Sequence, residues 1–98
     1  MKRVVVRPAA ASDIEDAYRW YESQRAGLGD EFLAALRLAQ DRLLEHPEAY
    51  PVLHRDTRRA LIPERFPYGL FYRIYGDMIV VAACMHANRD PRRWQRRS

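Results

Sequence analysis

The first half of the chain contains two stretches in which apolar residues recur at helical spacing. In the first stretch these residues stand at i, i+3, i+4 and i+7 and are Ile14, Ala17, Tyr18 and Tyr21. Ser12 and Glu15 have the spacing of a capping box and predict that this helix begins at Ser12. The second apolar stripe consists of Phe32, Leu36, Ala39 and Leu43. It predicts a helix that runs from a cap at Asp30 to His46-Pro47, and the glycine turn 27–29 makes the two helices an antiparallel hairpin.

Short runs of β-branched and aromatic residues predict strands on both sides of this hairpin. Before it stands the run Val4-Val5-Val6, which Pro8 ends. After it, in a stretch interrupted by prolines, come the runs 58–62, 69–75 and 78–85. The dipeptide Gly76-Asp77 between the last two runs predicts a tight hairpin turn.

The predicted order is βααβββ, which defines an α+β fold. We expect a single domain over residues 1–98, with the helical hairpin packed on one face of a small, mainly antiparallel sheet. The first strand can lie parallel to a later one, because a two-helix crossover separates them. Side chains alternate along 69–75, so Arg73 is expected on the face opposite Leu70, where no helical layer is predicted. Regular structure is expected to end at Pro91, before a basic C-terminal tail at 92–98.

The net charge of +4 is unevenly distributed along the chain. Residues 9–48 contain four basic and nine acidic side chains, a net charge of −5, whereas residues 49–98 contain ten basic and four acidic ones, a net charge of +6. Sixteen of the 17 basic residues are arginines, although a GC-rich genome explains such a ratio equally well. The guanidinium group suits bidentate contacts with phosphates and carboxylates, so the second half is expected to face a polyanion or an acidic partner.

Composition excludes several classes of protein. The single cysteine, Cys84, allows no internal disulfide and leaves a cysteine-based metal site without ligands. His46 and His54 stand apart in loops, so no metal site is predicted, and the turn 27–29 lacks the Lys-Ser/Thr continuation of a phosphate-binding loop, so no cofactor is expected. The longest apolar run, 78–85, is shorter than the ~20 residues of a membrane span, and no signal segment is visible. We therefore expect a cytoplasmic protein that does not contact the membrane.

A series of short motifs runs through nearly the whole chain in a recognisable order. They are Arg7-Pro8, Asp13-Ile14, Trp20-Tyr21-Glu22, 27–33, 46–51, Arg59-Ala60-Leu61, Arg65-Phe66-Pro67-Tyr68, Phe71-Tyr72-Arg73, and 86–91 with Trp94. In their joint order and spacing they resemble the RelE/ParE superfamily of toxins from bacterial type II toxin–antitoxin modules, its ParE-like branch most closely. The resemblance implies a compact toxin of the plasmid-stabilisation kind, which a cognate antitoxin neutralises in a hetero-oligomeric complex.

One function that the resemblance implies is that of a RelE-like, ribosome-dependent mRNA endoribonuclease. In such an enzyme the ribose 2′-OH attacks the adjacent phosphate without a metal, so basic residues must orient the phosphate, stabilise its charge and move two protons. The candidates for this chemistry are Arg65, Arg73, His86 and Arg89. Arginine is a poor acid or base, so His86 is the expected proton-transfer group.

Two departures from the nuclease pattern favour the ParE-like branch. RelE-like nucleases have an arginine directly after the aromatic residue that opens the central hairpin strand, where this chain has Gly69 after Tyr68. They also have a tyrosine near the C-terminus, where this chain has Trp94 without a hydroxyl group. Arg73 has the same face parity as Gly69 and could replace the missing arginine. The ParE-like branch includes inhibitors of DNA gyrase that act by binding, so we assign no catalytic residue and expect an inhibitor rather than an enzyme.

The residues expected to contact a target or an antitoxin are Arg59, Arg73, His86, Arg89 and Trp94. An antitoxin complementary to them has an acidic, amphipathic tail, and the target is DNA gyrase or, in the alternative, the ribosome with its mRNA. A third hypothesis is that toxicity has been lost and that the chain is an antitoxin partner or co-repressor. Two of these residues also have a purely structural explanation, His86 as a hydrogen-bonded strand-end histidine and Trp94 as part of the core.

Overall fold

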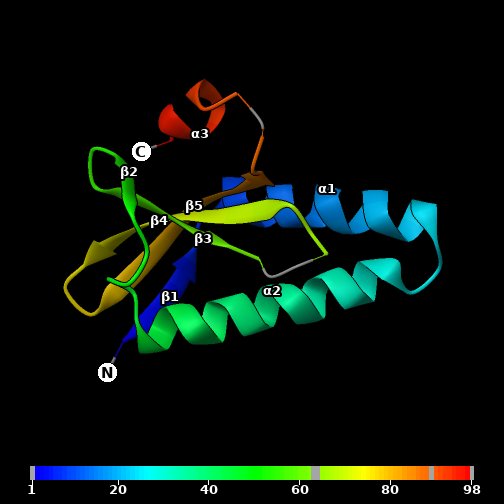
Figure 1. The fold of residues 1–98 in the computed structure, drawn as a ribbon, viewed down its shortest axis with the longest axis horizontal. Coiled ribbons are helices and arrows are strands. Elements are labelled where there is room, and N and C mark those ends of the chain that lie inside the picture. The colour runs from blue at the N-terminus through cyan, green and yellow to red at the C-terminus, as the bar shows by residue number, and fades with distance from the viewer. Residues whose placement is uncertain (1, 63–64, 89, 98) are drawn as a thin grey trace.

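The computed structural model describes residues 2–62, 65–88 and 90–97, which form a five-stranded sheet with helices on both faces (Figure 1). In chain order the elements are β1 (Arg3–Val6), α1 (Pro8–Gln24), α2 (Leu28–Glu45), β2 (Val52–His54), β3 (Thr57–Leu61), β4 (Tyr68–Tyr75), β5 (Met78–His86) and α3 (Arg92–Gln95). The strand order is β1-β5-β4-β3-β2. β1 is parallel to β5 and the other pairs are antiparallel. The predicted α+β fold, with its helical hairpin and parallel first strand, is confirmed.

α1 begins earlier than the capping box predicts. Its N-cap is Arg7 and its first residue is Pro8, a position where proline costs little because its missing N–H would have no partner within the helix. Ser12 therefore lies inside α1, and the prediction that it caps the helix is wrong. The local signal at Ser12 and Glu15 is overridden because β1 passes directly into the helix at this proline.

The turn between α1 and α2 is capped by a side chain from the first helix. The carboxylate of Glu22 accepts hydrogen bonds from the N–H groups of Gly27, at 3.0 Å, and Gly29, at 2.9 Å. α2 accordingly begins at Leu28 with Gly27 as its N-cap, so the predicted cap at Asp30 is wrong. Asp30 lies in the first helical turn, where a negative charge interacts favourably with the helix dipole.

The sheet contains one strand more than predicted, and the other strand boundaries move by a residue. β2 has three residues, too few for an alternating pattern, and pairs with β3 at Val52↔Arg58 and His54↔Thr57. The predicted hairpin turn between β4 and β5 is confirmed. Gly76 has a φ of 60° there, in the left-handed region that residues with a Cβ avoid.

The segment after Pro91 is helical, so the predicted end of regular structure at this residue is wrong. α3 is a single turn, and the ring of Trp94 stacks on Phe71 of β4 with 4.5 Å between the centroids and 18° between the planes. Burial of these rings holds the turn against the sheet face that was expected to be uncovered. A single turn is too short to show a helical period in the sequence.

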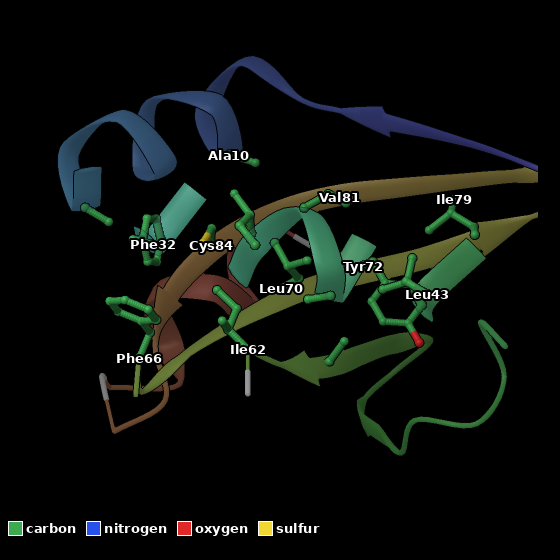
Figure 2. Packing of buried hydrophobic residues seen from close by; sticks show 14 of the residues in the cluster. Ala10, Phe32, Leu43, Ile62, Phe66, Leu70, Tyr72, Ile79, Val81 and Cys84 are labelled. Carbon is green, nitrogen blue, oxygen red and sulfur yellow. The ribbon is translucent and has the colours of Figure 1, made fainter. Parts of the chain in front are cut away.

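Two apolar clusters lie on opposite faces of the sheet. The larger one lies between the hairpin and the sheet, and Figure 2 shows Phe32 and Phe66 within it. There the aromatic side chains of Tyr21, Phe32, Phe66 and Tyr68 meet at centroid distances of 4.9 to 5.9 Å. Leu70 and Tyr72 of β4 belong to it, whereas Phe71 belongs to the smaller cluster with Ala83, Met85 and Trp94. The alternation predicted along this strand is therefore confirmed.

Candidate functional site

The structure divides the predicted site residues between the two faces of the sheet. Arg59 pairs with Phe71 across β3 and β4, and Arg73 follows two residues later on β4, so both lie on the face that carries α3. His86 lies on the helical-hairpin face, with its ring centroid 5.6 Å from that of Tyr68. Arg89 lies outside the described residues. Arg73 and His86 therefore do not face one common site.

Arg73 has its charge compensated near the turn end of β4. Its guanidinium forms an ion pair with Asp56 at 3.4 Å and lies 6.0 Å from the centroid of the Tyr75 ring. Its side chain is only 23% exposed. This arrangement orients Arg73 along the strand surface and leaves part of its side chain accessible to a partner.

The space above Gly69 is filled by Arg59. A Cβ placed on Gly69 would lie 2.9 Å from Cγ and 3.1 Å from Cδ of Arg59, closer than ordinary van der Waals contact. Glycine at this position therefore allows the aliphatic part of Arg59 to lie flat across β4. The nuclease pattern has an arginine at position 69. In this chain the space above Gly69 is filled by Arg59 of the neighbouring strand β3, whereas Arg73 lies four residues after Gly69 on β4.

Arg65 and His86 come together in a groove of about 700 Å³ between α1 and the β4–β5 end of the sheet. Trp20, whose side chain is largely exposed, and Arg93 of α3 also line this groove. The sequence predicted Arg93 only as part of a basic C-terminal tail that is solvated or contacts a target or antitoxin, so its place in this groove was not expected. The groove therefore brings two predicted residues and one unpredicted cation together.

The two predicted residues in this groove each have a partner. Arg65 forms an ion pair with Glu31 at 2.6 Å, and Arg25 contacts the same carboxylate at 2.8 Å. The hydrogen bonds from Arg65 and Arg25 lower the pKa of Glu31 below its ordinary value. Nδ1 of His86 accepts a hydrogen bond from the N–H of Asn88 at 3.1 Å, which leaves Nε2 as the ring nitrogen that can face a ligand.

The outer edge of β5 is covered by an ion pair that sequence reasoning also missed. β1 pairs with β5 only as far as Val81, so among the described residues no strand neighbours the edge beyond it. There the Asp13 carboxylate accepts a hydrogen bond from the N–H of Cys84 at 3.0 Å and pairs with Arg97. Arg97 also donates to the carbonyl of Ala82 at 3.3 Å. This pair satisfies an exposed strand edge, which would otherwise be open to another chain.

The remaining chemical candidates do not form a reactive centre. Burial raises the pKa of the Cys84 thiol to about 12, so the thiolate that reactive cysteines need is not formed near neutral pH. Within residues 2–62, 65–88 and 90–97, no three His, Cys, Asp or Glu side chains are grouped so that they could hold a metal ion. In the same part of the chain, no helix has the length and apolar character needed to cross a membrane.

The fold and the surface define the class of protein: a small basic α+β domain whose described arginines are spread over a sheet face and a groove. A model of the family described as the ParE toxin of the type II toxin–antitoxin system parDE matches residues 4–91, and the chain belongs to this family. Among solved structures, it is similar to a chain of the chromosomal ParDE toxin–antitoxin system from P. aeruginosa. That match has a TM-score of 0.65 and 17% identity, and covers 88% of this chain and 96% of the other. No curated protein matches significantly.

Proposed function

We propose that this ParE-family toxin arrests growth in the cytoplasm by binding DNA gyrase, and that an acidic, amphipathic antitoxin neutralises it. The observation that carries the first part is the division of the candidate nuclease residues. General acid–base catalysis needs its groups within hydrogen-bonding reach of the same reacting atoms, about 2.6–3.2 Å. Arg73 and His86 face opposite sides of the sheet, and both Arg65 and Arg73 have acidic partners. This arrangement supports inhibition by binding.

The proposed antitoxin interface combines apolar and charged contacts. Exposed apolar side chains lie on the helical hairpin, with Trp20 56%, Leu33 38% and Leu38 52% exposed. An amphipathic tail that buries them gains most of its affinity there, because charge pairs at the rim contribute only ~0–1 kcal/mol each. Carboxylates that approach Arg59 and Arg73 instead speed association and make it depend on salt.

The gyrase proposal is tested with purified protein in a supercoiling assay. We expect the chain to inhibit supercoiling of relaxed plasmid, or to accumulate cleaved DNA, at toxin concentrations comparable to that of gyrase. No effect at large molar excess would overturn the gyrase target. The antitoxin part is tested separately by stopped-flow association with the cognate antitoxin, where Arg59→Ala with Arg73→Ala should slow association and flatten its salt dependence. An unchanged rate and slope would contradict this placement of the interface.

One observation favours the endoribonuclease as a second candidate function. The groove holds Arg65, His86 and Arg93 together, which are two groups for phosphate contacts and one for proton transfer. Primer extension on mRNA from cells that express the chain separates the two candidates. Codon-phased cuts that disappear in His86→Ala would establish the nuclease, and intact transcripts in growth-arrested cells would exclude it. Overexpression without any growth effect would instead support the hypothesis of a non-toxic antitoxin partner.

A further inference from the structure

α3, the strand β3 and the turn between β2 and β3 carry a group of arginines, which we call the α3 face: Arg55, Arg59, Arg92, Arg93 and Arg96. We propose that the α3 face binds the phosphate backbone of duplex DNA. This inference goes beyond the proposed function, since it requires neither gyrase nor an antitoxin.

The arginines of α3 are held on a folded element rather than on a loose tail. Trp94 is buried against Phe71 on one side of the turn, and Arg97 is held by Asp13 of α1 on the other. With these two residues directed to the protein, Arg92, Arg93 and Arg96 are left exposed to solvent. Cations fixed in place lose less conformational freedom when they bind a ligand than those of a flexible tail.

Two of these cations are available for an external anion. Arg92 donates to both carboxylate oxygens of Asp90, at 2.7 to 3.2 Å, and holds the pKa of Asp90 down to about 2. The ion pairs found in the described ranges of the chain do not include Arg93 or Arg96. Arg93 and Arg96 are therefore the strongest candidates for phosphate contacts.

The sheet beneath α3 extends the same positive surface. The aliphatic part of Arg59 lies flat above Gly69, and Arg59 is paired with Phe71 across β3 and β4, so its side chain belongs to the face next to α3. The ring of His54 lies 6.1 Å from that of Trp94, so the turn between β2 and β3, with Arg55, is next to α3. Figure 1 shows this turn and α3 on the same side of the molecule.

The chemistry of α3 favours a duplex over an unpaired strand. Proteins that bind single strands combine cations with exposed aromatic rings on which bases stack. The aromatic ring of α3 belongs to Trp94, which is buried and already stacked on Phe71. α3 itself therefore presents arginines without a free ring, whereas the exposed ring of Trp20 belongs to α1, in the groove that Arg93 also lines. Such a set of cations suits the regular phosphates of a double helix, which cations contact independently of sequence.

The test is fluorescence anisotropy of the purified chain with a labelled 20-base-pair DNA duplex, between 50 and 200 mM NaCl. The logarithm of the binding constant should fall linearly with the logarithm of salt concentration, and each lost phosphate contact should reduce the slope by ~0.9. The double variant Arg93→Ala, Arg96→Ala should therefore reduce the slope by about 2. The matched control is Arg37→Ala, Arg42→Ala, which removes the same charge from exposed positions on α2 and should leave the slope unchanged.

Gly69→Ala tests the role of Arg59 without removing any charge. The added methyl group would displace the Arg59 chain, so this variant should reduce the slope by about 1, as Arg59→Ala does. Thermal melts of each variant check the fold.

No binding of wild type at 50 mM NaCl would overturn the proposal, as would an equal loss of slope in the α2 control. Tighter binding to single-stranded RNA or to polyglutamate would also overturn it, and a wild-type slope in Gly69→Ala would exclude Arg59 from the face. The assay contains no gyrase, so its failure is distinct from failure of the gyrase proposal.

Discussion

The two faces of the sheet are covered in different ways. One face is closed by two long helices over a continuous apolar layer, in which Phe32, Leu43 and Leu70 are fully buried. The other face is covered only in part, by a single helical turn held through the Trp94–Phe71 stack and the Asp13–Arg97 pair. Most of the buried apolar area lies on the first face, and exposed arginine surrounds the helical turn on the second.

This difference teaches where stability and recognition reside in so small a domain. A chain of 98 residues has enough apolar side chains for one main core, so the second face can remain a thin, charged surface. A change in the main core should therefore affect the whole fold, whereas a change on the second face should affect α3 first. The following predictions test this comparison, from the largest expected effect to the smallest.

Phe32→Ala should lower the free energy of unfolding by about 3–5 kcal/mol, because it removes a fully buried ring from the aromatic cluster of the hairpin face. Urea unfolding followed by circular dichroism measures the change. Leu38→Ala, at a position that is 52% exposed on the same helix, is the control and should change stability by less than ~0.5 kcal/mol. Equal effects of the two substitutions would contradict the placement of the core.

Tyr72→Phe should cost about 1–3 kcal/mol, because it leaves the carbonyl of Pro47 without the hydroxyl that donates to it at 2.5 Å. This bond joins β4 to the loop after α2, so the loss should appear in global unfolding. Tyr75→Phe, at an exposed position on the same strand, is the control. A neutral Tyr72→Phe would show that water replaces the lost donor.

Alkaline pH provides a second test of the same residue. Burial raises the pKa of Tyr72 from 10.0 to about 12. The unfolded chain therefore loses this proton first, and the stability that the neutral phenol contributes is complete below pH 10 and lost as pH rises towards 12. Urea midpoints measured across this range should fall less steeply in Tyr72→Phe than in wild type. Parallel curves would mean that Tyr72 ionises freely in the folded state.

Trp94→Ala should lower global stability by only about 1–2 kcal/mol, because a single turn can open without exposing the main core. Its main effect should be local. Hydrogen exchange of the amides in α3 should become fast, while that of β5 stays slow. Cooperative loss of protection in both elements would show that the second face is part of the main folding unit.

Asp13→Asn should have the smallest effect, about 1 kcal/mol, because the amide oxygen still accepts from Cys84 N–H while the charge opposite Arg97 is removed. Faster exchange at residues 95–97 with an almost unchanged urea midpoint is the expected result. Glu15→Gln, whose partner Arg19 is exposed, is the control for removing a surface ion pair and should leave exchange at the C-terminus unchanged. If both variants behave alike, the Asp13 pair does not hold the C-terminal segment.

The apolar pattern of the chain was sufficient to determine the fold class. The two helices, the central strands and the Gly76-Asp77 turn depend on local periodicity and local backbone preference, which are written in neighbouring residues. The side of β4 on which Arg73 lies followed from the same alternation, because the side-chain period of a strand is two. The predicted start of the first helix was wrong, because Ser12 satisfies a local capping rule that the connection from β1 to α1 overrides.

Only the tertiary structure decided which distant residues meet, because such contacts leave no periodic signal in the sequence. Arg97 pairs with Asp13, which lies 84 positions away in the sequence. Arg59 lies over Gly69 only because of the register of β3 with β4. Trp94 is buried because its ring stacks on that of Phe71. The register of β4 with β5 placed Arg73 and His86 on opposite faces, although both were candidates for one site. The sequence alone determined the kinds of side chain available for binding. Strand pairing and the packing of one terminal turn decided which of them share a surface.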